Sequence, residues 1–187
     1  MKQKYFNPKI EVQNAADNLV EVSMLFGDVK TIDLTVEIAK ANYELPENKR
    51  LQLFGGDTLY NCKTLNKGQQ AVKGLILVVP WHKELDAAKP FLDRAKPLWG
   101  GDVAWRTATS YDATKAFLDA LSNSGTNPTR STILEKLKEV NLPPEETSGQ
   151  NLRFNPDGEP LGKPMLVEVV ESNDPYCSYL NFHLVEE

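Results

Sequence analysis

The chain has 187 residues, of which 41% are hydrophobic and 25% charged, with a net charge of −5 and an isoelectric point near 5.2. These values fit a soluble globular protein of one domain, or one and a half small ones, and exclude the basic face that nucleic-acid binding requires. No apolar run approaches the roughly 20 residues of a membrane span, and the first residues lack the charged, apolar and small-residue order of a secretory signal.

The first part of the sequence alternates apolar runs with a helical pattern. Residues 1–17 are polar, and we expect an irregular segment there with Asn7–Pro8 as a turn. A helix is predicted from Thr31 to about Asn42, because its apolar residues recur at helical spacing. Strands are predicted for three compact apolar runs, 19–26, 51–54 and 75–79, which are expected to lie side by side in a parallel sheet.

After Pro80 the pattern changes to helices and then to short strands. Helices are predicted for 84–96, for 107–122 and for a third segment around 133–140. The second helix has an expected inner stripe of Tyr111, Thr114, Phe117, Leu118 and Leu121. Short closing strands are predicted at 152–154, 165–170 and 179–185. Strand, helix, strand, loop and strand, followed by helices and late strands, indicates an α/β fold.

Cysteine and histidine give weak signals. Cys62 and Cys177 are far apart and have no metal-binding spacing, so two unpaired buried thiols are the favoured interpretation, with a disulfide left open. His82 and His183 have no second ligand nearby, so neither a metal nor another cofactor is expected. Cys62 with His82 is the best nucleophile pair on offer, and it is a weak one.

Four segments carry a resemblance to a known family. They are VAWRTATSYDATKAFLDAL from Val103, GQNLRFNPDGEP from Gly149, LQLFGGDTLYN from Leu51 and VKGLILVVPWH from Val72. In this order they resemble the C-terminal portion of type I periplasmic solute-binding proteins, such as the branched-chain amino-acid receptors of ABC transporters. The resemblance is to an order of elements and runs from about residue 18 to the end.

The resemblance implies a domain organisation. Residues 18–82 would be βαβ units of a second lobe, 83–142 helices that return toward a first lobe, and 149–187 closing and hinge strands. Most of the first lobe would then be missing from this sequence. We therefore expect it to be part of a longer, extracytoplasmic protein whose signal peptide lies elsewhere, and to bind amino acids weakly by itself. The alternative is a cytoplasmic location, as part of a sensor protein.

Two candidate ligand contacts follow predicted strands. Asp57 comes after Gly55–Gly56, at the carboxyl end of a strand, where loops of open α/β sheets face the ligand. In relatives an acidic residue there pairs with the ammonium group of an amino acid; the alternative is that Asp57 only caps the following turn or helix. Phe26 lies in the preceding strand's loop, where relatives place an aromatic ring over the ligand, but core packing is favoured for it.

Three more candidates lie at the start of the second predicted helix. Trp105 and Arg106 could stack on a ligand and bind its carboxylate, or Arg106 could pair with Asp102 or Asp112 and hold the structure. Tyr111 carries strong family resemblance, and a place in the core is favoured for it.

The favoured function is a non-enzymatic module that binds a small, amino-acid-like solute between two lobes by hinge closure, for ABC-type uptake or for sensing. Its expected partners are the ligand and either a transporter's membrane component or a fused signalling domain. The alternatives are a sensory or interaction domain that has lost amino-acid binding and, with less support, an α/β hydrolase-like enzyme. The enzyme lacks sequence support because there is no G-x-S-x-G elbow, P-loop or G-x-G-x-x-G motif.

Overall fold

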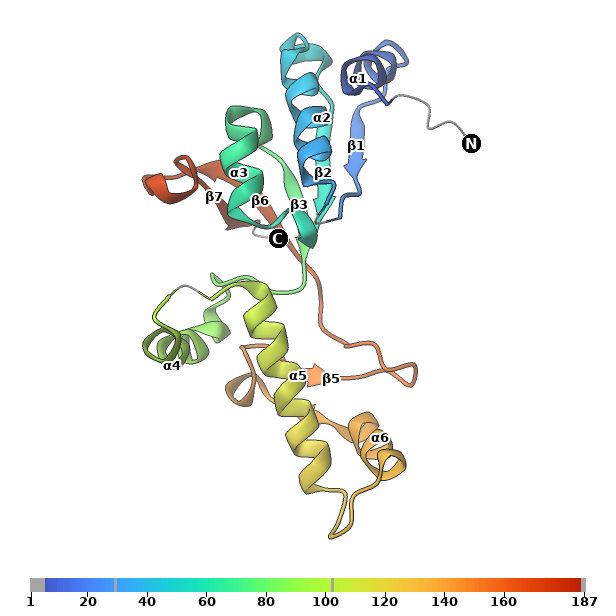
Figure 1. The fold of residues 1–187 in the computed structure, drawn as a ribbon, viewed down its shortest axis with the longest axis vertical. Helices are drawn as coiled ribbons and strands as arrows, with labels where there is room; N and C mark the ends of the chain where they lie inside the picture. The colour runs from blue at the N-terminus through green and yellow to red at the C-terminus, as the bar shows by residue number, and fades with distance from the viewer. Residues whose placement is uncertain (1–5, 29, 102, 186–187) are drawn as a thin grey trace. The chain divides into compact units, whose positions relative to one another are not determined.

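The computed structural model of the protein describes residues 6–28, 30–101 and 103–185. The chain divides into two compact units, which are coloured along the sequence in Figure 1. Unit 1 comprises residues 1–79 and 166–187, and unit 2 comprises residues 80–165. Unit 1 is therefore assembled from two separate stretches of sequence, whereas unit 2 is continuous.

Unit 1 is an α/β layer built on a five-stranded sheet with the strand order β1-β2-β3-β6-β7. The first three strands are parallel neighbours, as the sequence predicts, and β6 and β7 are antiparallel. The elements are α1 (Pro8–Asp17), β1 (Val22–Leu25), α2 (Ile32–Glu44), β2 (Gln52–Gly56), α3 (Cys62–Gly68), β3 (Ile76–Val79), β6 (Met165–Glu171) and β7 (Leu180–Leu184). Short 3-10 turns cover Glu47–Lys49, Asp57–Leu59, Gln69–Val72 and Pro175–Cys177.

Helices α2 and α3 lie over one face of this sheet (Figure 1). Alternate strand residues are buried, among them Leu53, Leu77, Val79, Val167 and Val169. Such alternation places one side chain in every two toward the covering helices. At Gly55 the strand packs closely against its cover, since a Cβ there would come within 2.7 Å of the Leu59 side chain. Strand β2 includes Gly55 and Gly56, although the sequence predicted that these glycines end the strand.

The expected irregular N-terminal segment is wrong for its second half, because residues 8–17 form helix α1. The dipeptide read as a turn is a helix start. The Asn7 side chain accepts hydrogen bonds from the backbone N–H groups of Lys9 and Ile10, and Pro8 occupies the first helical position. Proline is tolerated there because its missing N–H would have no helical partner. The first five residues lie outside the described part.

A disulfide joins the two stretches of unit 1. Cys62, the first residue of α3, is bonded to Cys177 in the turn before β7, with a Cα–Cα distance of 5.2 Å. The favoured interpretation of unpaired thiols is therefore wrong. The pairing left no mark in the sequence because 115 residues separate the two cysteines.

Unit 2 is mainly helical. Its elements are α4 (Lys89–Trp99), α5 (Trp105–Ser122), α6 (Arg130–Glu139), β4 (Asn141–Leu142) and β5 (Leu152–Arg153), with 3-10 turns at Asp86–Ala88 and Pro144–Glu146. The two short strands pair in antiparallel fashion. Helix α4 begins five residues later than the sequence predicts, after the turn at Asp86–Ala88. In the described residues of both units, no helix is long and apolar enough to cross a membrane.

The predicted inner stripe of α5 is wrong for four of its five residues, Thr114, Phe117, Leu118 and Leu121, which are exposed. The helix buries Ala108, Ala116 and Ala120, while Phe117 and Leu118 are 53% and 57% exposed. Ala116 and Ala120 pack with Val140, Leu142 and side chains of α6. Small residues let the helix approach its neighbours closely, so the larger side chains of α5 point elsewhere. The large apolar side chains of Phe117 and Leu118 made the sequence predict that their face is buried, whereas the alanine face is the buried one.

Candidate ligand-binding site

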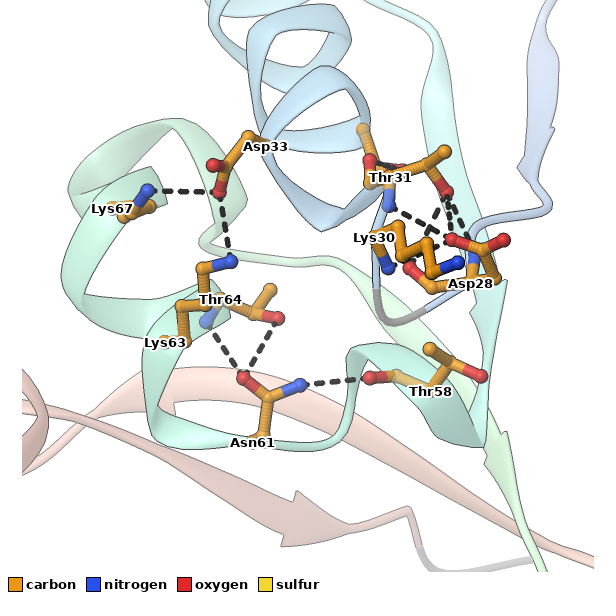
Figure 2. Close-up of polar contacts among 10 residues, drawn as sticks. Asp28, Lys30, Thr31, Asp33, Thr58, Asn61, Lys63, Thr64 and Lys67 are labelled. Carbon is orange, nitrogen blue, oxygen red and sulfur yellow. Dashed lines mark hydrogen bonds and ion pairs between the residues drawn. The ribbon is translucent and has the colours of Figure 1, made fainter.

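Polar side chains gather at the carboxyl ends of β1 and β2 (Figure 2). Because the two strands are parallel neighbours, the loops that follow them leave the sheet at the same edge. One loop runs from Phe26 to the start of α2, and the other runs from Asp57 to the start of α3. This edge is where the sequence placed Phe26 and Asp57.

The loop after β1 is fixed by its own polar groups. The carboxylate of Asp28 accepts hydrogen bonds from the backbone N–H groups of Lys30 (2.8 Å) and Thr31 (2.9 Å) and from the Thr31 hydroxyl (3.1 Å). These bonds, the one from Lys30 first, lower the pKa of Asp28. Gly27 allows a close approach, since a Cβ there would lie 2.7 Å from the Thr35 hydroxyl. The carboxylate of Asp28 therefore accepts hydrogen bonds from its own loop and stabilises the conformation of that loop.

The loop after β2 is capped by Asn61. Its side-chain oxygen accepts a hydrogen bond from the Thr64 N–H (3.0 Å), and its amide donates to the carbonyl of Thr58 (2.7 Å). Asn61 is the N-cap of α3, so this helix is not capped by Asp57, the alternative role considered from the sequence. The half-buried Asp57 carboxylate makes no hydrogen bond or ion pair with the part of the chain that the structure describes.

An ion-pair cluster joins the first turn of α2 to both ends of the short helix α3 beside these loops. Asp33 of α2 accepts from Lys67 (2.8 Å) and Lys63 (3.1 Å) of α3. Hydrogen bonding to Lys67 and then to Lys63 lowers the pKa of Asp33. Lys63 and Lys67 therefore both form ion pairs with Asp33, and neither pairs with Asp57.

Phe26 is not a core residue, although core packing was favoured. Its side chain is 88% exposed at the end of β1. It contributes to a mainly apolar cavity of about 440 Å³ between α1, β1 and α2. An aromatic ring is therefore available in the loop where the family resemblance calls for one.

The Trp105–Arg106 pair and Tyr111 lie in unit 2, at the start of α5. The half-buried Trp105 packs against a cluster that contains Trp81 and Phe91, and the Arg106 guanidinium lies 4.4 Å from the centre of the Trp105 ring. No described carboxylate lies within ion-pair distance of Arg106; Asp102, one predicted partner, falls outside the described residues. Tyr111 packs 4.9 Å from Phe91, which gives it the core position that the sequence favoured.

Asp112, the other predicted partner of Arg106, is bonded elsewhere. Both of its carboxylate oxygens accept from Ser148, one from the backbone N–H at 2.7 Å and the other from the hydroxyl. The Trp81 indole N–H in turn donates to the Ser148 carbonyl (2.9 Å). Burial raises the pKa of Asp112, and the two bonds from Ser148 oppose this shift.

A second cavity, of about 340 Å³, lies within unit 2 and went unpredicted. Its lining includes Trp81, Thr109, Asp112, Gln150 and Phe154. Thr109 and Asp112 are one helical turn apart, so the sequence alone could have indicated that they share one face of α5. The segment that faces them begins 36 residues beyond Asp112, and nothing in the sequence links the two.

Comparison with known proteins rests on the fold. No protein-family model and no curated protein sequence matches the chain. Solved structures do match. A leucine-binding protein from Thermotoga maritima aligns with a TM-score of 0.72 and 19% identity, over 100% of this chain and 50% of the other. An ABC-transporter substrate-binding protein from Sphaerobacter thermophilus gives 0.75 and 17%, over 100% and 49%.

This chain has the fold of type I solute-binding proteins. The fold resemblance predicted from the sequence is thus confirmed, at identities that carry information about fold alone. A further match is a solute-binding protein of an ABC transporter from Rhodopseudomonas palustris BisB5, solved with 3,4-dihydroxybenzoic acid, with a TM-score of 0.70 and 13% identity over 96% of this chain and 48% of that one. The chain spans about half the length of these solute-binding proteins.

Proposed function

We propose that this chain belongs to a non-enzymatic module that binds a small solute with an ammonium group, an amino acid or a close relative, for ABC-type uptake or for sensing. The observation that carries the proposal is the Asp57 carboxylate, which is half-buried at the carboxyl end of β2 and has no described protein partner. Its neighbours Asp28 and Asp33 are already bonded within the protein. Asp57 is thus the acid of this edge that is open to a cationic group.

A charge-assisted hydrogen bond explains why this arrangement favours an ammonium ligand. Such bonds are about twice as strong as neutral ones and strengthen further where water is excluded. The exposed Phe26 ring follows the adjacent strand and offers an apolar cover for a ligand side chain. A carboxylate at Asp57 would repel an anionic ligand that lacks an ammonium group.

Arg106 supports a second ligand class. Its guanidinium is held over the Trp105 ring and has no described acidic partner, a combination that suits a ligand carboxylate. The solved neighbours span both classes by their names, one being a leucine-binding protein and another being solved with 3,4-dihydroxybenzoic acid. An aromatic acid would therefore be the alternative ligand, with Arg106 in place of Asp57 as the main contact. Closure of two lobes around either ligand stays a prediction.

The disulfide supports an extracytoplasmic location, because structural disulfides persist mainly in oxidising compartments. Its presence also removes the hydrolase-like pair of Cys62 and His82, since Cys62 holds no thiol. A transporter's membrane component or a fused signalling domain would receive the bound state. A domain that has lost its ligand is less well supported, because Phe26 is exposed in the loop where relatives place an aromatic ring over the ligand.

The test is calorimetric titration of the longest natural polypeptide that contains this sequence, with leucine, isoleucine, valine and 3,4-dihydroxybenzoate. Asp57→Ala should weaken amino-acid binding by about ten- to a hundredfold. Asp86→Ala is the matched control, because Asp86 is an exposed acid in unit 2. Equal affinities for all three proteins would refute the role of Asp57. Tight dihydroxybenzoate binding that is lost in Arg106→Ala would favour the alternative.

A further inference from the structure

The Cys62–Cys177 disulfide lies next to the loop that carries Asp57. The side-chain amide of Asn61 donates to the Thr58 carbonyl at 2.7 Å, one residue after Asp57, and thereby closes this loop (Figure 2). Cys62 follows Asn61 directly, as the first residue of α3. The bond to Cys177 therefore fixes the end of the Asp57 loop to the turn before β7.

Two noncovalent contacts join the same parts of unit 1. The Tyr60 ring packs edge-on against Phe182 of β7, with 4.6 Å between the ring centres. The Ser178 hydroxyl donates to the side chain of Asn66, one helical turn beyond Cys62, at 2.6 Å. This hydrogen bond is exposed, so water competes for both partners and the bond contributes little. The disulfide is therefore the strongest of these links.

The turn before β7 has a backbone conformation that depends on its surroundings. Ser178 and Tyr179 both have φ of +60°, in the left-handed region that residues other than glycine seldom adopt. Such conformations persist where neighbouring contacts hold them. Cys177 immediately precedes this pair, so the disulfide holds the turn from outside. Without the bond to Cys62 we expect the backbone to relax and the turn to move away from α3.

A reductant can reach this disulfide. Cys62 and Cys177 are both partly exposed, and the residues from Asn173 to Tyr176 beside them are exposed. Thiol–disulfide exchange begins when a thiolate attacks one of the two sulfurs, so its rate depends on this access. Exposed disulfides are also the ones that tend to be labile or regulatory.

We propose that the Cys62–Cys177 disulfide regulates the Asp57 site, so that the thiol–disulfide state of the surroundings sets ligand affinity. The inference rests on the proposed function of Asp57 as the contact for an ammonium group. In the oxidised protein the loop is held in one conformation before the ligand arrives. In the reduced protein, binding must first order the loop, and the entropy that is lost lowers the affinity.

The change of state needs a dithiol reductant. Its thiolate attacks the Sγ of one cysteine, which breaks the S–S bond, forms a mixed disulfide and releases the other cysteine as a thiolate that takes up a proton. The second thiol of the reductant then attacks the mixed disulfide, releases the first cysteine as a thiol and closes a disulfide in the reductant. Two electrons and two protons thus pass to the protein, and a disulfide oxidant reverses the change.

Hydrogen exchange tests the link between the disulfide and the loop without any ligand. The sample is the longest natural polypeptide that contains this sequence, either oxidised or treated with dithiothreitol. Tyr60 and Asn61 in the loop and Ser178 in the turn have hydrogen-bonded amides. Reduction should speed their exchange by about tenfold, while the amides of β2 change little. Reoxidation should restore the slow exchange, which excludes irreversible unfolding.

Two variants separate the bond from other effects. Cys62→Ser combined with Cys177→Ser should exchange rapidly at the same amides and should no longer respond to dithiothreitol. Glu171→Gln is the matched control, because it removes the ion pair of β6 with Lys73 (2.7 Å) but leaves the contacts of α3 unchanged. Exchange in the Asp57 loop should stay slow in this variant.

Calorimetric titration of the same polypeptide with leucine measures the effect on binding. Reduction should weaken leucine binding by about three- to tenfold, and the double serine variant should bind leucine as the reduced protein does. In Asp57→Ala any residual affinity should be the same in the two states, because the contact that the disulfide controls is gone.

Different results would overturn different parts of the proposal. Equal exchange of Tyr60 and Asn61 in the oxidised and reduced states, or an equal acceleration throughout β2, would overturn the link between the disulfide and the loop. Accelerated loop exchange with equal leucine affinities would overturn the regulation. Absence of leucine binding in the oxidised protein would refute the proposed function, while faster loop exchange would still establish the link.

Discussion

The side chain of Asn42 makes both hydrogen bonds of a strand partner to the backbone of Leu51. Its amide donates to the Leu51 carbonyl and its oxygen accepts from the Leu51 N–H, both at 2.9 Å, and both residues are buried. The end of α2 is thereby fixed to the residue before β2. The contact therefore fixes where the chain enters β2, the strand that Asp57 follows.

Asn42→Ala should therefore destabilise the protein by about 2–4 kcal/mol, because it leaves a buried N–H and a buried carbonyl without partners. Urea unfolding followed by circular dichroism would measure the loss. Asn18→Ala is the control, since exposed Asn18 bonds only to the carbonyl of Asn14 within its own helix end. A loss for Asn42→Ala no larger than for Asn18→Ala would contradict this account.

Gly149→Ala should destabilise unit 2 by about 2–4 kcal/mol. The residue has φ of +114°, and a Cβ there would lie 2.6 Å from the backbone of Ala88. Gly125 separates the two causes, because its φ is +80° but nothing lies within 4 Å of its Cβ position. Gly125→Ala should cost only about 1 kcal/mol of backbone strain. Similar thermal shifts for both variants would mean that the contact with Ala88 relaxes freely.

Asp112 should make the protein's stability depend on pH with a sign opposite to that of most acids. Burial raises the pKa of Asp112 above 3.8, so the folded state favours the protonated carboxyl group. The stability that this preference contributes is fully present below the pKa of the unfolded state and is lost as the pH rises through the pKa of the folded state. Ionisation of Asp112 therefore lowers the free energy of unfolding relative to the protonated form as the pH rises. Asp112→Asn should remove this dependence between about pH 3 and pH 7, as measured by unfolding free energies at each pH.

A second variant separates the charge of Asp112 from its hydrogen bonds. Asp112→Ala should lose about 1–3 kcal/mol at neutral pH, because the buried Ser148 N–H loses its acceptor. Equal stability of the Ala and Asn variants at every pH would show that the bonds to Ser148 contribute nothing measurable.

Reduction of the disulfide should lower the free energy of unfolding by about 2–4 kcal/mol, since the bond closes a long loop in the unfolded chain. Urea unfolding with and without a thiol reductant gives the difference, and Cys62→Ser with Cys177→Ser should reproduce it without reductant. A double variant that unfolds at the same urea concentration as the oxidised protein would disprove the stabilisation.

The sheet was predictable because its strands are marked by continuous apolar runs. The runs at 19–26, 51–54 and 75–79 contain β1, the start of β2 and β3, in the predicted parallel order. Helix α1 was missed because Asn7–Pro8 serves both as a turn signal and as a helix start, and local sequence does not choose between them. The buried face of α5 was missed because alanine packs there in place of leucine.

The positions of the candidate residues were predictable in part, and their role as ligand contacts stays a prediction. The place of Asp57 at the carboxyl edge of the sheet follows from its position directly after a strand. Asp57 does not cap α3 because Asn61 does, and both residues have side chains that commonly cap helices. The exposure of Phe26 and the partner of Asp112 depend on contacts between distant segments, and a single sequence holds no record of these.

The discontinuous construction of unit 1 bears on how the protein is made. Strands β1, β2 and β3 precede unit 2 along the chain, whereas β6, β7 and Cys177 follow only after the whole of unit 2 has been synthesised. Unit 2 is continuous in sequence, so it is complete while β3 is still open on the side that β6 later covers. During that interval the edge of β3 that β6 later covers lacks its partner strand, and we expect this stage of synthesis to be prone to aggregation.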